Sequence, residues 1–141
     1  MRLSAKVEYG VRSMAVLAVT SRNRPLPLRE IAEKEMISLK FLEQIFPDLK
    51  RAGLILSVRG SSGGYMLSRS PERIRVGDIV RALDGPITPV TCLSEKETDM
   101  CCHHGKECLT RRVWEKLRDK MNDVLDDITL NELVESDPVK N

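Results

Sequence analysis

Four cysteines fall within one window of 17 residues: Cys92, Cys101, Cys102 and Cys108. In a cytoplasmic chain thiols stay reduced, so clustered cysteines favour metal or redox chemistry over a disulfide framework. Their spacing, C-x8-C-C-x5-C, lacks the paired CxxC knuckles of structural zinc. It is more typical of an iron–sulfur cluster, which needs several thiolate ligands. His103 and His104 are further candidate ligands. Because adjacent cysteines rarely bind one metal together, we expect either Cys101 or Cys102 to be spare.

Two alternatives for the cysteines stay open. The thiols can be unligated, or Cys101 and Cys102 can serve a thiol oxidoreductase. Vicinal cysteines form only a strained eight-membered ring, and no catalytic base constellation or phosphate loop accompanies them. We therefore expect a protein that is not an enzyme.

The distribution of charge indicates a polyanion-binding front half. The net charge is only +2, but residues 1–84 carry +6 and residues 85–141 carry −4. The longest wholly apolar run, Met14 to Val19, is too short to cross a bilayer. No secretory leader is visible, so we expect a cytoplasmic protein without a membrane partner.

The elements that would position these residues are those of a winged helix-turn-helix. Apolar runs at 54–58 and 65–67 flank a Gly/Ser turn, which predicts a β-hairpin. Three amphipathic helices precede it, over 3–20, from Pro27 and from Ser38. The first also holds Glu8 and Arg12 one turn apart, a spacing typical of a solvated ion pair. The fold class is thus mainly α with a small β-hairpin wing.

The helix that Ser38 caps would be the recognition helix in the major groove. Lys40, Glu43 and Gln44 would face base edges, since Glu accepts from cytosine and Gln can bracket adenine. Phosphates suit Ser38, Lys50 and Arg51, and a narrow minor groove suits Arg59 on the wing. Double-stranded DNA is therefore the expected partner. A winged helix that binds only other proteins is the alternative.

We predict three parts: a winged helix-turn-helix over 1–85, a linker with a cysteine segment over 86–109, and a dimerisation helix with a short last helix over 110–141. Pro86 and Pro89 punctuate the linker. The long helix carries an apolar seam at heptad spacing: Trp114, Leu117, Met121, Val124 and Ile128. A seam this narrow needs a partner helix, so we expect a homodimer, with packing inside one chain as the alternative.

Two stretches of the chain resemble the Rrf2 family of winged-helix transcription regulators. They are FLEQIFPDLKRAGLILSVRGSSGGYMLSRSPERIRVGDIVRALDG at 41–85 and CLTRRVW at 108–114. The resemblance implies a dimer to which the first helix also contributes, and contacts to a roughly palindromic operator. It places those contacts at Ser38, Lys40, Phe41, Glu43, Gln44 and Arg59. A hydroxyl residue is common at the position of Lys40, so the target sequence is expected to differ.

The same resemblance implies a 2Fe–2S or 4Fe–4S cluster that senses redox state, nitric oxide or iron–sulfur status. The family's three cysteines fall on Cys92, Cys102 and Cys108. The first interval is longer here, so Cys101 is the alternate to Cys102. Arg111 stands where a ligating histidine occurs in the iron–sulfur biogenesis regulator, which leaves the fourth ligand to Glu8 of the partner subunit. Some members are cluster-free, so control by thiol oxidation or by a partner protein is the alternative.

Overall fold

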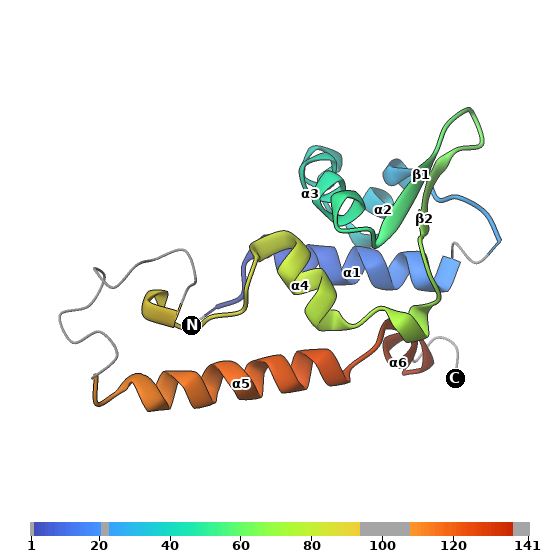
Figure 1. Ribbon diagram of the computed structural model, residues 1–141. Coiled ribbons are helices and arrows are strands. Elements are labelled where there is room, and N and C mark those ends of the chain that lie inside the picture. Colours follow the sequence, from blue (N-terminus) through green and yellow to red (C-terminus); the bar gives the residue numbers. More distant parts are fainter. Residues whose placement is uncertain (1, 21–22, 94–107, 137–141) are drawn as a thin grey trace.

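A computed structural model describes residues 2–20, 23–93 and 108–136. The order of elements is helix, helix, helix, hairpin, helix and two further helices, with two short 3-10 turns between them (Figure 1). The hairpin projects from one side of the molecule, and a long helix lies on the other, with α1 and α4 between them. The predicted fold class is confirmed. The predicted division into three parts stays a prediction.

α1 (Ala5–Thr20) is the central helix of the core. Ser4 caps it, because the Val7 amide donates to Ser4 Oγ at 3.3 Å. Its inward face includes Val7 and Met14, and both are buried. The helix predicted over 3–20 begins two residues later, and Leu3, which precedes it, is 53% exposed.

The helix-turn-helix consists of α2 (Leu28–Glu35) and α3 (Leu39–Arg51). Met36 adopts a left-handed conformation (φ 52°) between them, and its side chain is exposed. As predicted, Ser38 caps α3, since its Oγ accepts from the Phe41 amide at 3.3 Å. Gly53, with φ 78°, follows the end of α3 in the left-handed conformation that ends many helices. Four apolar residues of α3 are buried: Leu42, Ile45, Phe46 and Leu49.

The wing is an antiparallel pair of β1 (Ile55–Val58) and β2 (Gly64–Leu67), with Ile55 opposite Leu67. Leu26 adds a bridge to Tyr65 through two backbone hydrogen bonds of 2.9 Å. Gly64, with φ 153°, permits this approach, because a Cβ there would overlap the Leu26 carbonyl and lie 2.6 Å from Pro27 N. The wing is thus anchored to the segment that leads into α2.

After the wing come η1 (Pro71–Arg73), α4 (Val76–Asp84), η2 (Thr91–Leu93), α5 (Arg111–Asp127) and α6 (Leu130–Glu135). Thr129 caps α6, accepting from the Glu132 amide at 3.3 Å. Leu130 and Val134 of α6 enter the same core as α1 and α3. No helix in the described ranges is long and apolar enough to span a membrane.

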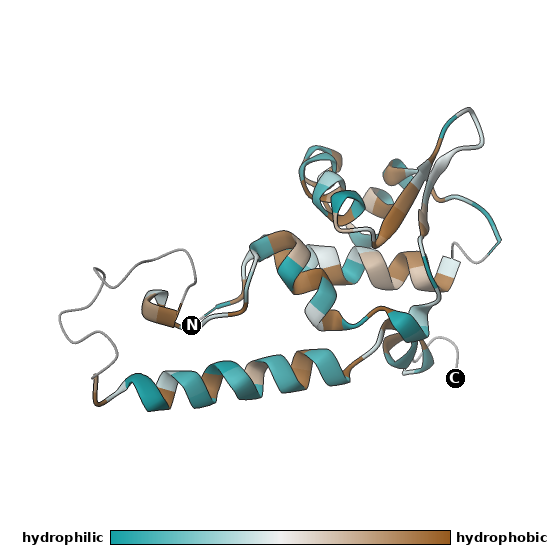
Figure 2. Cartoon of the chain, viewed as in Figure 1, coloured by the Kyte–Doolittle hydropathy of each residue, from teal (hydrophilic) through white to brown (hydrophobic). Residues whose placement is uncertain are grey.

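α5 packs on the rest of the chain along one side only. Polar residues dominate its surface, with apolar positions at intervals (Figure 2), and none of its described residues is buried. Met121 and Leu125 pack against the core, as does Ile128 at its end. Val124, which is one turn from both Met121 and Ile128, is 58% exposed. The predicted seam is therefore divided between the chain's own core and the outer surface.

Candidate nucleic-acid interface and cysteine segment

The outer face of α3 is polar and exposed, as predicted. The side chains on it are Lys40, Glu43, Gln44, Lys50 and Arg51. Lys50 Nζ donates to Ser57 Oγ at 2.8 Å, which ties the end of α3 to β1. Arg51 pairs with Asp48 of its own helix at 3.0 Å, although Arg51 remains largely exposed. Helix and wing therefore form one basic surface with a direct hydrogen bond between them.

The turn of the wing carries Arg59, which is exposed next to the end of β1. Ser38 is also exposed, at the start of α3. These two positions belong to the start of α3 and to the turn of the wing. Exposed polar side chains at a helix start and on a wing suit contacts to phosphates or to a minor groove beside a helix in the major groove.

Phe41 differs from the other predicted DNA contacts because it is half-buried. Its ring packs edge-to-face on Tyr9 of α1, with centroids 5.5 Å apart. The guanidinium carbon of Arg12 also lies over the Tyr9 ring, 5.5 Å from its centroid. Phe41 therefore connects the start of α3 to α1. Its predicted contact with DNA stays a prediction.

Arg12 pairs with Glu35 at the end of α2 instead of with Glu8. Its Nη2 lies 3.0 Å from Glu35 Oε2 and also donates to the Glu35 carbonyl at 3.0 Å. Glu8 is exposed on α1. Sequence spacing suggested a pair within α1, but the packing of α2 against α1 supplies a carboxylate with better geometry.

The cysteine segment begins and ends on described residues. Cys92 lies in η2 and is half-buried, and Cys108 lies just before α5 with its Sγ 3.1 Å from Thr110 Oγ1. The other predicted ligands, Cys101 and Cys102, lie outside the described residues, as do His103 and His104. Within the ranges that the structure describes, no group of three or more His, Cys, Asp or Glu side chains could hold a metal ion.

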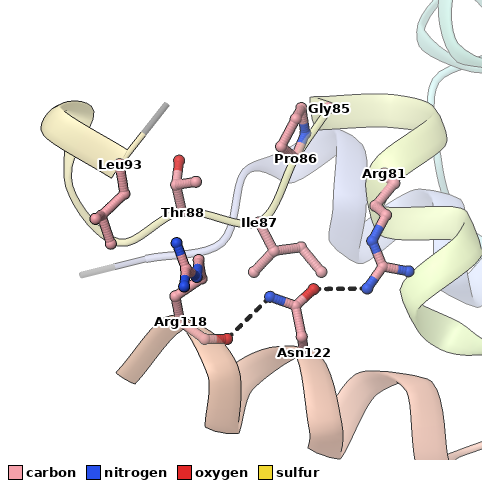
Figure 3. A pocket seen from close by; sticks show the side chains of 8 residues that line it. All are labelled: Arg81, Gly85, Pro86, Ile87, Thr88, Leu93, Arg118 and Asn122. Atoms are coloured by element: carbon pink, nitrogen blue, oxygen red, sulfur yellow. Dashed lines mark hydrogen bonds between the residues drawn. The ribbon is translucent and has the colours of Figure 1, made fainter. Parts of the chain in front are cut away.

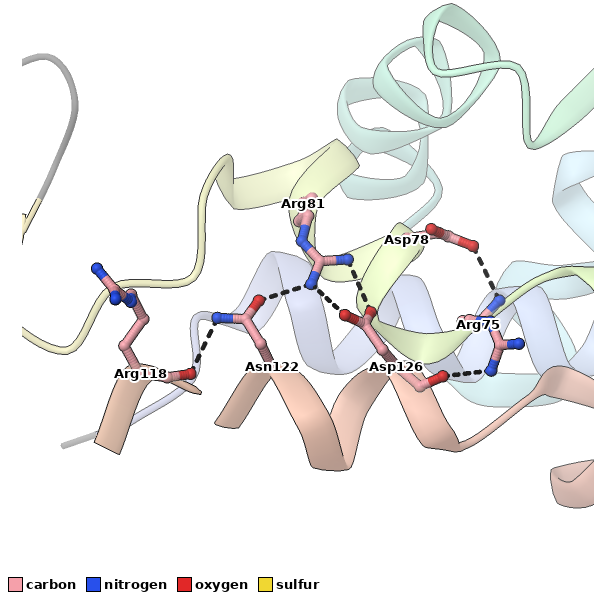
Figure 4. Close-up of polar contacts among 6 residues, drawn as sticks. All are labelled: Arg75, Asp78, Arg81, Arg118, Asn122 and Asp126. Carbon is pink, nitrogen blue, oxygen red and sulfur yellow. Dashed lines mark hydrogen bonds and ion pairs between the residues drawn. The ribbon is translucent and has the colours of Figure 1, made fainter. Parts of the chain in front are cut away.

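A polar network joins α4 to α5, and sequence reasoning missed it. Arg81 contacts both carboxylate oxygens of Asp126, at 2.8 and 2.7 Å, and donates to Asn122 Oδ1 at 2.6 Å (Figure 4). The Arg81 guanidinium lowers the pKa of the Asp126 carboxyl, and Asp126 raises the pKa of Arg81. The sequence signal was weak: a basic residue on one amphipathic helix and two polar residues one turn apart on another.

Two hollows flank the linker between α4 and α5. One, of about 400 Å³, brings Leu93, the neighbour of Cys92, to the same concavity as Arg81, Arg118 and Asn122 (Figure 3). The other is a groove of about 810 Å³ that Leu3, Met121 and Val124 line together with linker residues. The linker thus borders two hollows, one next to the start of the cysteine segment and the other next to the exposed side of α5.

Comparison with known proteins identifies the chain's relatives. A family model described as "Rrf2: Iron-dependent Transcriptional regulator" matches residues 3–136. The chain belongs to the Rrf2 family. The HTH-type transcriptional regulator IscR of Pectobacterium atrosepticum is 40% identical over 141 residues, covering all of this chain and 84% of the relative. IscR of Escherichia coli O1:K1 is 39% identical over 139 residues, covering 99% and 83%.

Solved structures give the same result. CymR, the global cysteine regulator of B. subtilis, has a TM-score of 0.79 and 36% identity, covering 97% of this chain and 98% of CymR. T. potens IscR has a TM-score of 0.76 and 37% identity, covering 96% and 87%. This member of the Rrf2 family is a DNA-binding transcriptional regulator. The resemblance stated from the sequence is confirmed, and the relatives also confirm the expectation that the protein is not an enzyme.

Proposed function

We propose that this Rrf2 regulator is a cytoplasmic homodimer whose affinity for operator DNA follows the state of an iron–sulfur cluster in its cysteine segment. The observation that carries the proposal is the set of donors: four cysteines between residues 92 and 108, directly before the long helix. Relatives named IscR, and a family model described as iron-dependent, support it. Redox state, nitric oxide and iron–sulfur supply are the candidate signals.

The donor chemistry fits such a group. Cys92 and Cys108 are half-buried, which leaves each thiol partly shielded yet accessible to a ligand. With Cys102, or Cys101 in its place, they offer three thiolates, the ligands that iron–sulfur clusters require. Glu8 of the partner subunit is the proposed fourth ligand. Its exposed position on α1 supports that role. When bound, the cluster supplies a centre that oxidants and nitric oxide can modify.

DNA recognition falls to the polar face of α3 and to the wing. The residues proposed to contact DNA are Ser38, Lys40, Phe41, Glu43, Gln44, Lys50, Arg51 and Arg59. The hydrogen bond between Lys50 and Ser57 supports a concerted role, because it holds the end of the helix against the wing. Phosphate contacts would fix the position of the protein, and Lys40, Glu43 and Gln44 would read bases.

The proposed dimer forms through α5 and the neighbouring groove. Four apolar side chains around them are strongly exposed: Leu3, Leu109, Val113 and Val124. Exposed apolar residues gathered beside a groove are typical of an interface. A second α5 crossing this surface would bury them and place two copies of α3 in a fixed relation. A dimer of this kind reads two half-sites, which gives a roughly palindromic operator.

Anaerobic purification tests the proposal. We expect a brown protein with iron and sulfide in similar amounts, and a change in affinity for operator DNA after the cluster is removed. Cys92→Ala and Cys108→Ala should each lose iron. Cys101→Ala and Cys102→Ala form a matched pair, of which only one should lose it. A colourless, iron-free protein that binds operator DNA with full affinity would refute the cluster.

A second function is a cluster-free regulator that responds to thiol oxidation or to a partner protein. The similarity to CymR favours it, and one of the similar structures is an oxidised form of Staphylococcus aureus CymR. In that case the wild-type protein would contain no iron, and neither would Cys92→Ala or Cys108→Ala. Peroxide, or an added partner enzyme, would then alter DNA affinity of the iron-free protein.

A further inference from the structure

The contact between α4 and α5 is specific in its geometry. We name Arg81, Asn122 and Asp126 the α4–α5 clasp. Arg81 holds Asp126 with two parallel hydrogen bonds, a planar arrangement that a lysine cannot reproduce. Arg75 adds a hydrogen bond from its guanidinium to the Asp126 carbonyl. The clasp therefore fixes the rotation of α5 about its own axis as well as its distance from α4.

Gly77 makes this approach possible. A Cβ at position 77 would overlap Asp126 Oδ1 and lie 2.9 Å from Arg81 Nη1. Gly77 lies inside α4, where alanine would otherwise favour the helix. The glycine thus costs local helix stability in return for room at the clasp.

α4 also contacts the segment that follows the wing. Asp78 Oδ2 accepts from the Arg75 amide at 3.0 Å and lies 3.6 Å from Arg69 Nη2. Arg69 follows β2 by two residues, in the segment that returns from the wing. One helix of nine residues therefore contacts both α5 and the segment that follows the wing.

The two described ends of the cysteine segment connect to the elements that carry the clasp. Leu93, next to Cys92, is buried and lines the concavity that Arg81 and Asn122 also line (Figure 3). Cys108 precedes α5 by three residues, so displacement of the segment acts directly on the helix that carries Asn122 and Asp126. A rigid helix transmits such a displacement along its length.

We propose that the α4–α5 clasp couples the state of the cysteine segment to the position of the wing. Arg81 and Asp126 are positioning residues: they act through α4 and α5, and they set how strongly a change at the segment alters DNA affinity. This inference rests on the proposed function. It adds the route by which α5 acts on the DNA-binding elements, through α4 and Asp78.

The test measures a ratio of affinities. A duplex that the wild-type protein selects from a random pool serves as probe, and its Kd is measured for the anaerobically isolated protein and after treatment with nitric oxide. Asp126→Asn and Gly77→Ala should each reduce the ratio of the two Kd values at least threefold, with unchanged iron content and absorption spectrum. Arg81→Lys keeps the charge without the paired geometry and should give an intermediate ratio.

Glu115→Gln is the matched control. It also replaces a carboxylate of α5 by an amide, but Glu115 pairs with Arg111 of the same helix at 2.9 Å, and among the described residues it pairs with no other element. Its ratio should equal that of wild type. A purely structural role for the clasp would lower thermal stability and leave the ratio unchanged in the variants, which would overturn the inference. If one variant fails to fold, the other two still report the ratio.

The two failures are distinguishable. A wild-type protein whose Kd is the same before and after nitric oxide refutes sensing through the segment, and the coupling falls with it. Suppose instead that the two Kd values of the wild-type protein differ clearly, and that Asp126→Asn, Gly77→Ala and Arg81→Lys all give the same ratio of Kd values as wild type. This result refutes only the coupling.

Discussion

Replacing Asp126 by Asn tests the electrostatics of the clasp through stability. The change keeps the shape of the side chain. It replaces the carboxylate, whose two oxygens accept hydrogen bonds from Arg81, by an uncharged amide with a single oxygen. Charged hydrogen bonds contribute about 1.5–3 kcal/mol, but exposed ion pairs contribute only about 0–1 kcal/mol. The Arg81 and Asp126 side chains are 35% and 40% exposed. Solvent screening therefore places the expected loss near 1 kcal/mol, or about 3–4 °C in Tm for a chain of this length.

The same carboxylate predicts how this difference depends on pH. Arg81 lowers the pKa of Asp126 in the folded protein, so its stabilisation is complete above the ordinary carboxyl pKa of about 3.9. It is lost as pH falls through the lowered value, because the protonated acid then resembles the amide. Thermal unfolding of wild type and Asp126→Asn should therefore differ at neutral pH and converge in acid.

The assay is circular dichroism at fixed protein concentration, since the proposed dimer makes Tm concentration-dependent. Glu115→Gln, whose pair lies within one helix, is the control and should shift Tm by about 1 °C or less, in line with the small value of exposed pairs. Equal Tm values for wild type and Asp126→Asn at neutral pH would refute the reasoning. So would a difference that persists undiminished at the lowest pH at which unfolding is reversible.

Three further predictions concern the core, the recognition helix and the wing. In Gly10→Ala the new Cβ overlaps Leu83 Cδ1. Overpacking costs about 1–3 kcal/mol, which exceeds or cancels the gain in helix propensity of about 1 kcal/mol. In urea unfolding, the double variant with Leu83→Ala should therefore lose less free energy of unfolding than the two single variants lose together. Additive losses would contradict this contact. Ser38→Ala removes the acceptor for the Phe41 amide and should cost about 1 kcal/mol in urea unfolding, with a smaller cost for Ser38→Gly; equal stability of Ser38→Ala and wild type would exclude the cap. Arg59→Ala should weaken binding to all duplexes and lower the slope of log K against log salt by about 0.9 for each phosphate interaction lost; an unchanged slope would place the wing tip away from DNA.

The winged helix could be predicted because its signals are local. Ser38 caps α3 through a bond to a residue three positions away, and Gly53 supplies the left-handed turn after it. The hairpin follows from apolar runs on both sides of a glycine-containing turn. Each depends on neighbours within a few residues, so the sequence contains all the information required.

The long helix shows where periodicity stops being sufficient. The heptad spacing of Met121, Val124 and Ile128 correctly predicted an apolar seam, but it carries no information on which surface the seam contacts. In the structure Met121 and Ile128 pack on the chain's own core, whereas Val124 is exposed. The crossing of α5 over α4 decides this division, and that crossing depends on residues of another helix.

By itself, the sequence determined the family, the order of helices and hairpin, and the donor set of the cysteine segment, because residue type and short-range spacing suffice for these. Tertiary structure alone decided that Arg12 pairs with Glu35 instead of Glu8, and that Arg81 meets Asp126 across 45 positions of the chain. Helical spacing brings together residues three or four apart. Partners from different helices meet only where the helices pack, and Gly77 shows how one missing side chain can set that approach.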